Sequence, residues 1–149
     1  MQLNQFFSHW DQVHQATLEV IDRFKEGELD HVPFEGSWTV KQIVLHIANA
    51  EEGWFRCVVQ KMYEDWPPSP DVENYPTIES LKTLLVDMHE KTMAYLSTQS
   101  LDDLDNVFES RWGNFSLRFV IWHVVEHEVH HRGELSLILG TLGREGWGA

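Results

Sequence analysis

The sequence predicts an all-α fold, a four-helix bundle, and three observations support this. Apolar residues recur at spacings of three and four along four separate stretches. Almost no segment alternates between apolar and polar residues as a half-buried strand would, and capping residues precede three of the four stretches. Four helices of roughly 20 residues each suit a bundle. We expect the 149 residues to form one domain, 1–149.

The bounds of each helix follow from its apolar stripe and its caps. Thr39 and Gln42 form a capping box before the second helix, and Thr77 and Ser116 are the N-caps of the third and fourth. Gly27 stands where the first helix would end in a left-handed residue. The helices are therefore expected at about 4–26, 40–63, 78–98 and from 117 to Gly140 or Gly143.

The connections between the helices bear on the topology. Segment 66–76 holds four of the five prolines, so 64–76 is expected to be a connector. Thirteen residues can span roughly 43 Å, whereas a helix of about 24 residues is about 36 Å long. The second and third helices could therefore be parallel. A loop rich in Asp and Asn is expected before Ser116, and 143–149 is expected to be a short C-terminal extension.

Composition excludes several classes of protein. Eleven basic residues against 24 acidic ones give a net charge of −13, which disfavours nucleic acid as a partner. The single cysteine, Cys57, allows no internal disulfide and suits the reducing cytoplasm. The N-terminus lacks the pattern of a signal peptide, and no apolar run reaches about 18 residues, so we expect neither standard export nor a membrane span.

The fourth helix carries the most informative pattern, because four of the nine histidines lie within 123–131. At 100° per residue, His123, His130, His131 and Glu134 all lie within about 60° of His127. This face is apolar at both ends, and burying imidazoles there is costly unless something binds them. Histidines four apart can meet one metal ion, as His127 could with His131 or with His123. The alternative is a partly solvated face or a hydrogen-bonded subunit interface.

A third metal ligand is expected from the second helix. His46 lies at the edge of that helix's apolar stripe, so its side chain can point inward. Taken alone, it is more typical of a hydrogen-bonded core histidine. The remaining histidines lack such partner spacing and are interpreted as surface or packing residues: His9, His14, His31 and His89.

Two segments of the sequence resemble the DinB/YfiT-like family. They are IVLHIANAEE on the second helix and LRFVIWHVVEHEVHHRGELSLIL on the fourth, of which HHRG is the most specific part; the SWTV segment is also similar. The resemblance implies a four-helix bundle with a divalent metal held by three histidines, which fall on His46, His127 and His131. Zinc or nickel is the metal that we expect, although iron, cobalt and manganese also suit imidazole ligands.

The same resemblance makes His123 and His130 neighbours of the ligands. Many members of the family have Gln where this chain has Glu134, whose carboxylate could become an extra ligand. Glu134 and His130 are candidate catalytic residues that could orient a ligand or relay a proton. The alternative is that Glu134 only pairs with a cation such as Arg132 or caps a polar cavity.

A zinc protease is a competing interpretation, because His127-Glu128-Val129-His130-His131 is literally H-E-x-x-H. Glu128 would then be the general base. No histidine follows at the positions that such enzymes use, and Glu145 lies in a Gly-rich tail. A chain without strands also offers nothing to hold a peptide, so a protease is disfavoured.

The resemblance implies an enzyme that acts on a small molecule, of the thiol-dependent transferase or isomerase type that uses bacillithiol or mycothiol. Three imidazoles leave a coordination position open, and a coordinated thiol is deprotonated outright. The same position could activate water, so a metal-dependent hydrolase is the alternative enzyme. A non-catalytic metal- or ligand-binding stress protein is the third hypothesis.

We also expect a homodimer. Seven tryptophans and eight phenylalanines are many for four helices to bury, and members of the resembled family are often homodimers.

Overall fold

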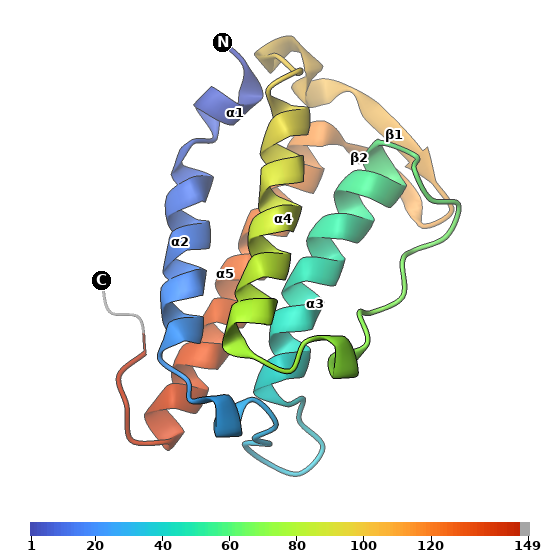
Figure 1. Ribbon diagram of the computed structural model, residues 1–149. Coiled ribbons are helices and arrows are strands. Elements are labelled where there is room, and N and C mark those ends of the chain that lie inside the picture. The colour runs from blue at the N-terminus through green and yellow to red at the C-terminus, as the bar shows by residue number, and fades with distance from the viewer. Residues whose placement is uncertain (147–149) are drawn as a thin grey trace.

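The computed structural model describes residues 1–146, in which four long helices pack side by side (Figure 1). Helix α2 contacts α4 and α5, and helix α3 also contacts both of them. Figure 1 shows that α3 and α4 run in the same direction, as the long connector permits, while α2 and α5 run the opposite way. The helices are α1 (Leu3–Phe6), α2 (His9–Asp22), α3 (Val40–Glu52), α4 (Ile78–Leu96) and α5 (Leu117–Thr141).

The predicted helix starts are confirmed by hydrogen bonds at the caps. The Gln42 amide N–H donates to Thr39 Oγ1 over 3.1 Å, and the Thr39 N–H donates to Gln42 Oε1 over 2.9 Å. Thr77 caps α4, and the Ser116 side chain accepts from the backbone N–H of Phe119. Each cap satisfies backbone donors that the first turn of a helix leaves free.

The first predicted helix, 4–26, starts close to the predicted residue, at Leu3, but it is interrupted and it ends early. It is divided into α1 and α2, and α2 stops at Asp22, where the Arg23 and Phe24 amides turn back to carbonyls three residues earlier. Lys25 is extended and begins a 3-10 turn, Glu26–Glu28, in which the Glu28 carboxylate accepts from the Lys25 N–H. Gly27 lies inside this turn, so it is not the left-handed cap that we predicted.

The second predicted helix, 40–63, ends at Val59, and its last segment, Gly53–Val59, is a π-helix. A side chain at Gly53 would overlap Trp66, since a Cβ built there lies 2.2 Å from the indole ring. The connector is held against this position because Trp66 Nε1 donates to Asn49 Oδ1, and Asn49 Nδ2 donates to the Pro67 carbonyl. Close packing of the connector therefore accompanies the change in helix geometry.

The all-α prediction holds only approximately, because the loop before α5 contains a β-hairpin. Strands β1 (Val107–Ser110) and β2 (Gly113–Ser116) pair antiparallel with Phe108 opposite Phe115. The loop also includes a 3-10 turn, Leu101–Asp105, and a second such turn, Val72–Asn74, lies in the connector. Strands of four residues are too short for their apolar alternation to stand out in the sequence.

The core consists of two apolar clusters with a buried polar layer between them along the bundle. One cluster is built around Ile21, Val44, Leu85 and Leu135, and the other around Trp10, Phe55, Leu96 and Val124. Each long helix contributes one member of the layer: His14, Glu51, His89 and Glu128. In residues 1–146, no helix is both long enough and apolar enough to cross a membrane. The end of the predicted C-terminal extension, 147–149, lies outside the described residues.

Candidate metal centre

The structure brings the three predicted ligands together. His46 lies on α3, and His127 and His131 lie one turn apart on α5, facing it. The Nε2 atoms of His46 and His127 are 2.9 Å apart, and those of His127 and His131 are 3.1 Å apart. One nitrogen from each ring lies within 4.8 Å of the others. We call these three residues the histidine triad.

The triad fits a divalent metal in its spacing and in its protonation. Two nitrogens each about 2.0–2.1 Å from a tetrahedral zinc ion are about 3.3 Å apart, close to the observed separations. Burial, reinforced by His131 and His46, lowers the pKa of His127 to about 3. Burial and then His131 also lower the pKa of His46. These rings are therefore neutral near pH 7, and neutral imidazole is the form that binds metals.

Glu134 contacts the triad through the imidazole of His131. Its Oε2 lies 2.7 Å from His131 Nδ1. Because a carboxylate can only accept, His131 Nδ1 donates to it, and Nε2 is the nitrogen that faces the other two rings. Arg132, which the alternative interpretation pairs with Glu134, donates to the Val13 carbonyl over 3.3 Å.

His130 is exposed and lies on the outer side of Glu134, with its Nε2 3.3 Å from Glu134 Oε1. His130, His131 and Glu134 form a second group with metal-ligand spacing that competes with the triad for His131. The triad is the better candidate, since its side chains are less exposed and all three ligands are imidazole nitrogens.

Aromatic rings flank the triad on both sides. Trp38, in the loop before α3, lies against His46 with ring centroids 4.6 Å apart and approaches His131 at 6.3 Å. The His123 ring packs 4.8 Å from Trp54 and stacks on Phe119, so it belongs to an aromatic cluster beside the triad. Trp38 belongs to the SWTV segment before the second predicted helix, and nothing in its spacing in the sequence points to His131.

Glu128 faces away from the triad, which removes the protease interpretation. Its carboxylate is 2% exposed and accepts from Trp10 Nε1 and from His14 Nδ1, each over 3.1 Å. Burial would raise the pKa of Glu128, but the hydrogen bonds, of which that from His14 has the largest effect, lower this pKa. A carboxylate held in this way is a buried structural anion and cannot reach a substrate.

His14 and His89 lie in the interior and not on the surface. Their rings stack with centroids 4.2 Å apart, and His89 Nε2 donates to Asp11 Oδ1 over 2.8 Å. Burial would lower the pKa of His89, but the carboxylates of Glu51 and Asp11 raise it above its ordinary value. These two histidines therefore belong to the polar layer of the core, whereas His9 is exposed.

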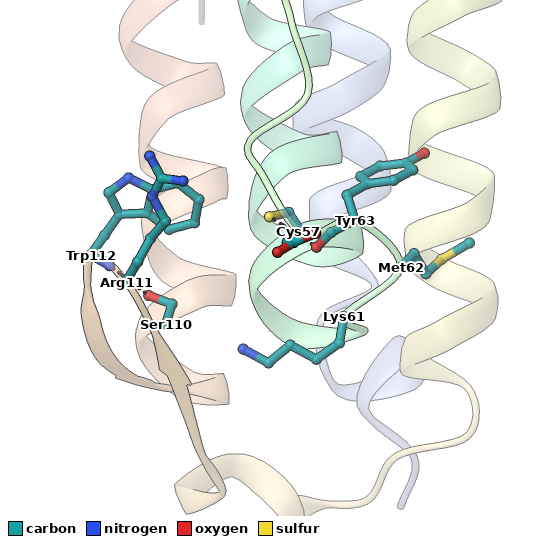
Figure 2. A pocket seen from close by; sticks show the side chains of 8 residues that line it. Cys57, Lys61, Met62, Tyr63, Ser110, Arg111 and Trp112 are labelled. Carbon is teal, nitrogen blue, oxygen red and sulfur yellow. Dashed lines mark hydrogen bonds between the residues drawn. The ribbon is translucent and has the colours of Figure 1, made fainter.

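The single thiol lies elsewhere, in a cavity of about 340 Å³ between the end of the π-helix and the hairpin. Figure 2 shows Cys57, Lys61 and Tyr63 on one side of this cavity, and Arg111 and Trp112 of the hairpin on the other. Burial raises the pKa of Cys57, whose Sγ faces the Tyr63 carbonyl at 3.6 Å. The chain's own thiol is thus protonated, and none of the residues that line its cavity belongs to the triad.

Together, the helical bundle and three converging imidazoles from two of its helices define a candidate metal-binding bundle protein. The sequence profile of the DinB superfamily matches residues 9–135, so the chain belongs to that superfamily. It is 25% identical to Bacillus subtilis YjoA, over 95% of this chain and 92% of YjoA. It is 24% identical to "Putative metal-dependent hydrolase OB0413" of Oceanobacillus iheyensis, over 83% of this chain and 77% of that protein.

Solved structures share the fold. A DinB-like protein from Bacillus cereus has a TM-score of 0.79 at 17% identity, covering 99% of this chain and 97% of its own. YfiT from Bacillus subtilis, described as "a probable metal-dependent hydrolase with an unusual four-helix bundle topology", has a TM-score of 0.56 at 22% identity. That match covers 89% of each chain, and both likenesses support the helical-bundle fold predicted from the sequence.

Proposed function

We propose that this protein is a metal-dependent enzyme that holds one divalent cation between His46, His127 and His131 and acts on a small molecule. The observation that carries the proposal is the convergence of three imidazole Nε2 atoms from two helices. Hydrolysis is the reaction that we favour, because OB0413 and YfiT are both named as metal-dependent hydrolases.

The histidine triad would hold the cation, and Glu134 would orient one of its ligands. A divalent cation supplies Lewis acidity, which lowers the pKa of a coordinated water or thiol. Three neutral imidazoles leave its double charge uncompensated, and three protein ligands leave a position open to substrate. Glu134 keeps His131 in the tautomer that directs Nε2 to the cation.

Thiol-dependent transfer is the second candidate, and the state of Glu134 favours it. This carboxylate accepts from His131 and also lies near His130, so it is engaged and not free to act as a general base. A coordinated thiol needs no separate base. Because Cys57 is buried and protonated, the thiol would have to be exogenous.

The experiment begins with protein that carries no affinity tag. Zinc and nickel are measured by elemental analysis after purification and after reloading, and we expect one ion per chain. The loaded protein is then assayed with ester, amide and electrophilic probes, with and without an added thiol. Turnover without thiol supports hydrolysis, and turnover that requires thiol supports transfer. Stoichiometric metal without turnover in either assay would contradict an enzymatic function.

Replacing Glu134 by glutamine should weaken zinc binding roughly tenfold, because the change removes the charge that holds His131 Nδ1 but keeps the size of the side chain. The affinity is measured by competition with a chromophoric chelator. Glu126→Gln, on the exposed face of α5, is the control and should bind zinc as the wild type does. An unchanged affinity in Glu134→Gln would mean that this carboxylate has no charge-dependent role in the site.

A further inference from the structure

A cavity of about 600 Å³ opens directly beside the histidine triad. Loop 33–38 forms one wall, and the C-terminal half of α5 forms the other. His131 and Glu134 line the cavity and also belong to the metal centre. This volume lies within the range of roughly 300–1,000 Å³ that is typical of small-molecule sites. A molecule held in the cavity would therefore have one end next to the triad.

The walls are apolar, and several of their side chains are exposed. Phe34 is 69% exposed, Trp38 47% and Leu137 71%. Large apolar side chains that surround a cavity while open to water gain stability when an apolar group covers them. Pro33, Ile43 and Ile138 complete the apolar part of the lining.

The charge of the lining is one-sided. Glu134 is a carboxylate, and among the residues of 1–146 that line the cavity there is no lysine or arginine. The chain as a whole also carries a net charge of −13. In the metal-free protein, an anionic group in this cavity would face a carboxylate without a compensating lysine or arginine, whereas a neutral or cationic group would not.

We infer that this cavity binds the apolar, aromatic-sized part of the substrate and that, in the metal-free protein, it favours neutral or cationic groups over anionic ones. The inference rests on the proposed function, because His131 joins the cavity to the metal centre. It extends that function by specifying the chemistry of the substrate. Phe34, Trp38 and Leu137 are the residues that determine the specificity.

The test uses three naphthalene probes of similar size and different charge: naphthylethanol, naphthylethylamine and naphthylacetate. Binding to the metal-free protein is measured by calorimetry, because a carboxylate could otherwise bind the metal itself. Naphthylethanol and naphthylethylamine should bind, and naphthylacetate should bind at least about fivefold more weakly, as expected for one nearby like charge. Equal affinity for the amine and the acetate would overturn the inference.

Leu137→Lys examines the same wall by adding a cation at an exposed position. Naphthylethanol binding should weaken roughly fivefold through lost apolar contact, and naphthylacetate binding should strengthen. Val129→Lys is the matched control, since Val129 is 39% exposed on the same helix and does not line the cavity. If Leu137→Lys binds all three probes as the wild type does, the cavity is not their site and the inference fails.

His127→Ala separates this inference from the proposed metal function. His127 belongs to the triad but does not line the cavity, so this variant should lose zinc and keep the affinities for the probes. Zinc binding without probe binding in the wild type would overturn the cavity inference alone. The alternative occupant of the cavity is a second copy of this chain, and sedimentation of the same samples tests for it. If the wild type binds no probe and Leu137→Lys converts a dimer to a monomer, a second copy covers the cavity.

Discussion

Replacing His127 by alanine is expected to weaken zinc binding by at least about 100-fold, the largest effect on affinity that we predict. His127 is the central member of the triad, with its Nε2 2.9 Å from His46 and 3.1 Å from His131. Without it, two imidazoles remain, and a pair does not complete the three-ligand set of an open zinc site. The affinity is measured by chelator competition. Zinc should also cease to stabilise the variant, whereas at 100 times Kd it should stabilise the wild type by about 2.7 kcal/mol.

Two other histidine variants make this result specific. His9→Ala changes an exposed ring on α2 and should leave zinc binding unchanged. His130→Ala removes a member of the competing group, His130, His131 and Glu134, and should have a much smaller effect than His127→Ala. If His130→Ala loses the metal and His127→Ala retains it, the ion is bound at the outer group and our assignment of the ligands is wrong.

Glu128→Ala should lower the free energy of unfolding by about 3–5 kcal/mol, the largest effect on stability that we predict. The substitution leaves two buried donors, Trp10 Nε1 and His14 Nδ1, without their acceptor. It also removes a negative charge from the polar layer, where His89 stacks on His14 and has a raised pKa. Removing the acceptor is costly because each donor stays buried and desolvated without a hydrogen-bond partner.

The measurement is urea unfolding at pH 7 in the presence of a chelator, so that the metal makes no contribution. Glu126→Ala is the control, because Glu126 lies two residues away on the exposed face of the same helix and should change stability by less than about 0.5 kcal/mol. A similar small change in Glu128→Ala would show that the buried network contributes little. It would also mean that stability does not account for the buried position of Glu128.

The sequence predicted the helix starts better than the helix ends. Thr39, Thr77 and Ser116 cap helices as expected, because an N-cap is a local interaction between residues three apart. The ends depend on distant contacts. After α3 the helix becomes a π-helix at Gly53, where Trp66 of the connector packs against it. Helix α2 ends at Asp22, although the apolar pattern in the sequence continues beyond that residue.

The candidate metal site was accessible from the sequence because most of it lies on one helix. The helical period alone places His127, His131 and Glu134 on one face of α5. His46 was a candidate from its place at the edge of an apolar stripe, and the family resemblance implied the same residue. Only the structure gives the division of roles among neighbours on that face. Glu134 contacts His131 Nδ1, His123 packs among aromatic rings, and His130 is exposed.

The sequence by itself determined the helical class, the parallel course permitted for α3 and α4, and the face of α5 that carries His127, His131 and Glu134. These features follow from short-range periodicity, caps and connector length. Tertiary structure alone decided which side of α5 Glu128 faces and where Trp38 and Phe34 lie. The buried layer formed by Glu128 and His14, and the apolar cavity beside His131, are each built from elements far apart in the chain. No local pattern encodes such contacts, because their geometry exists only when the helices and the loop have packed together.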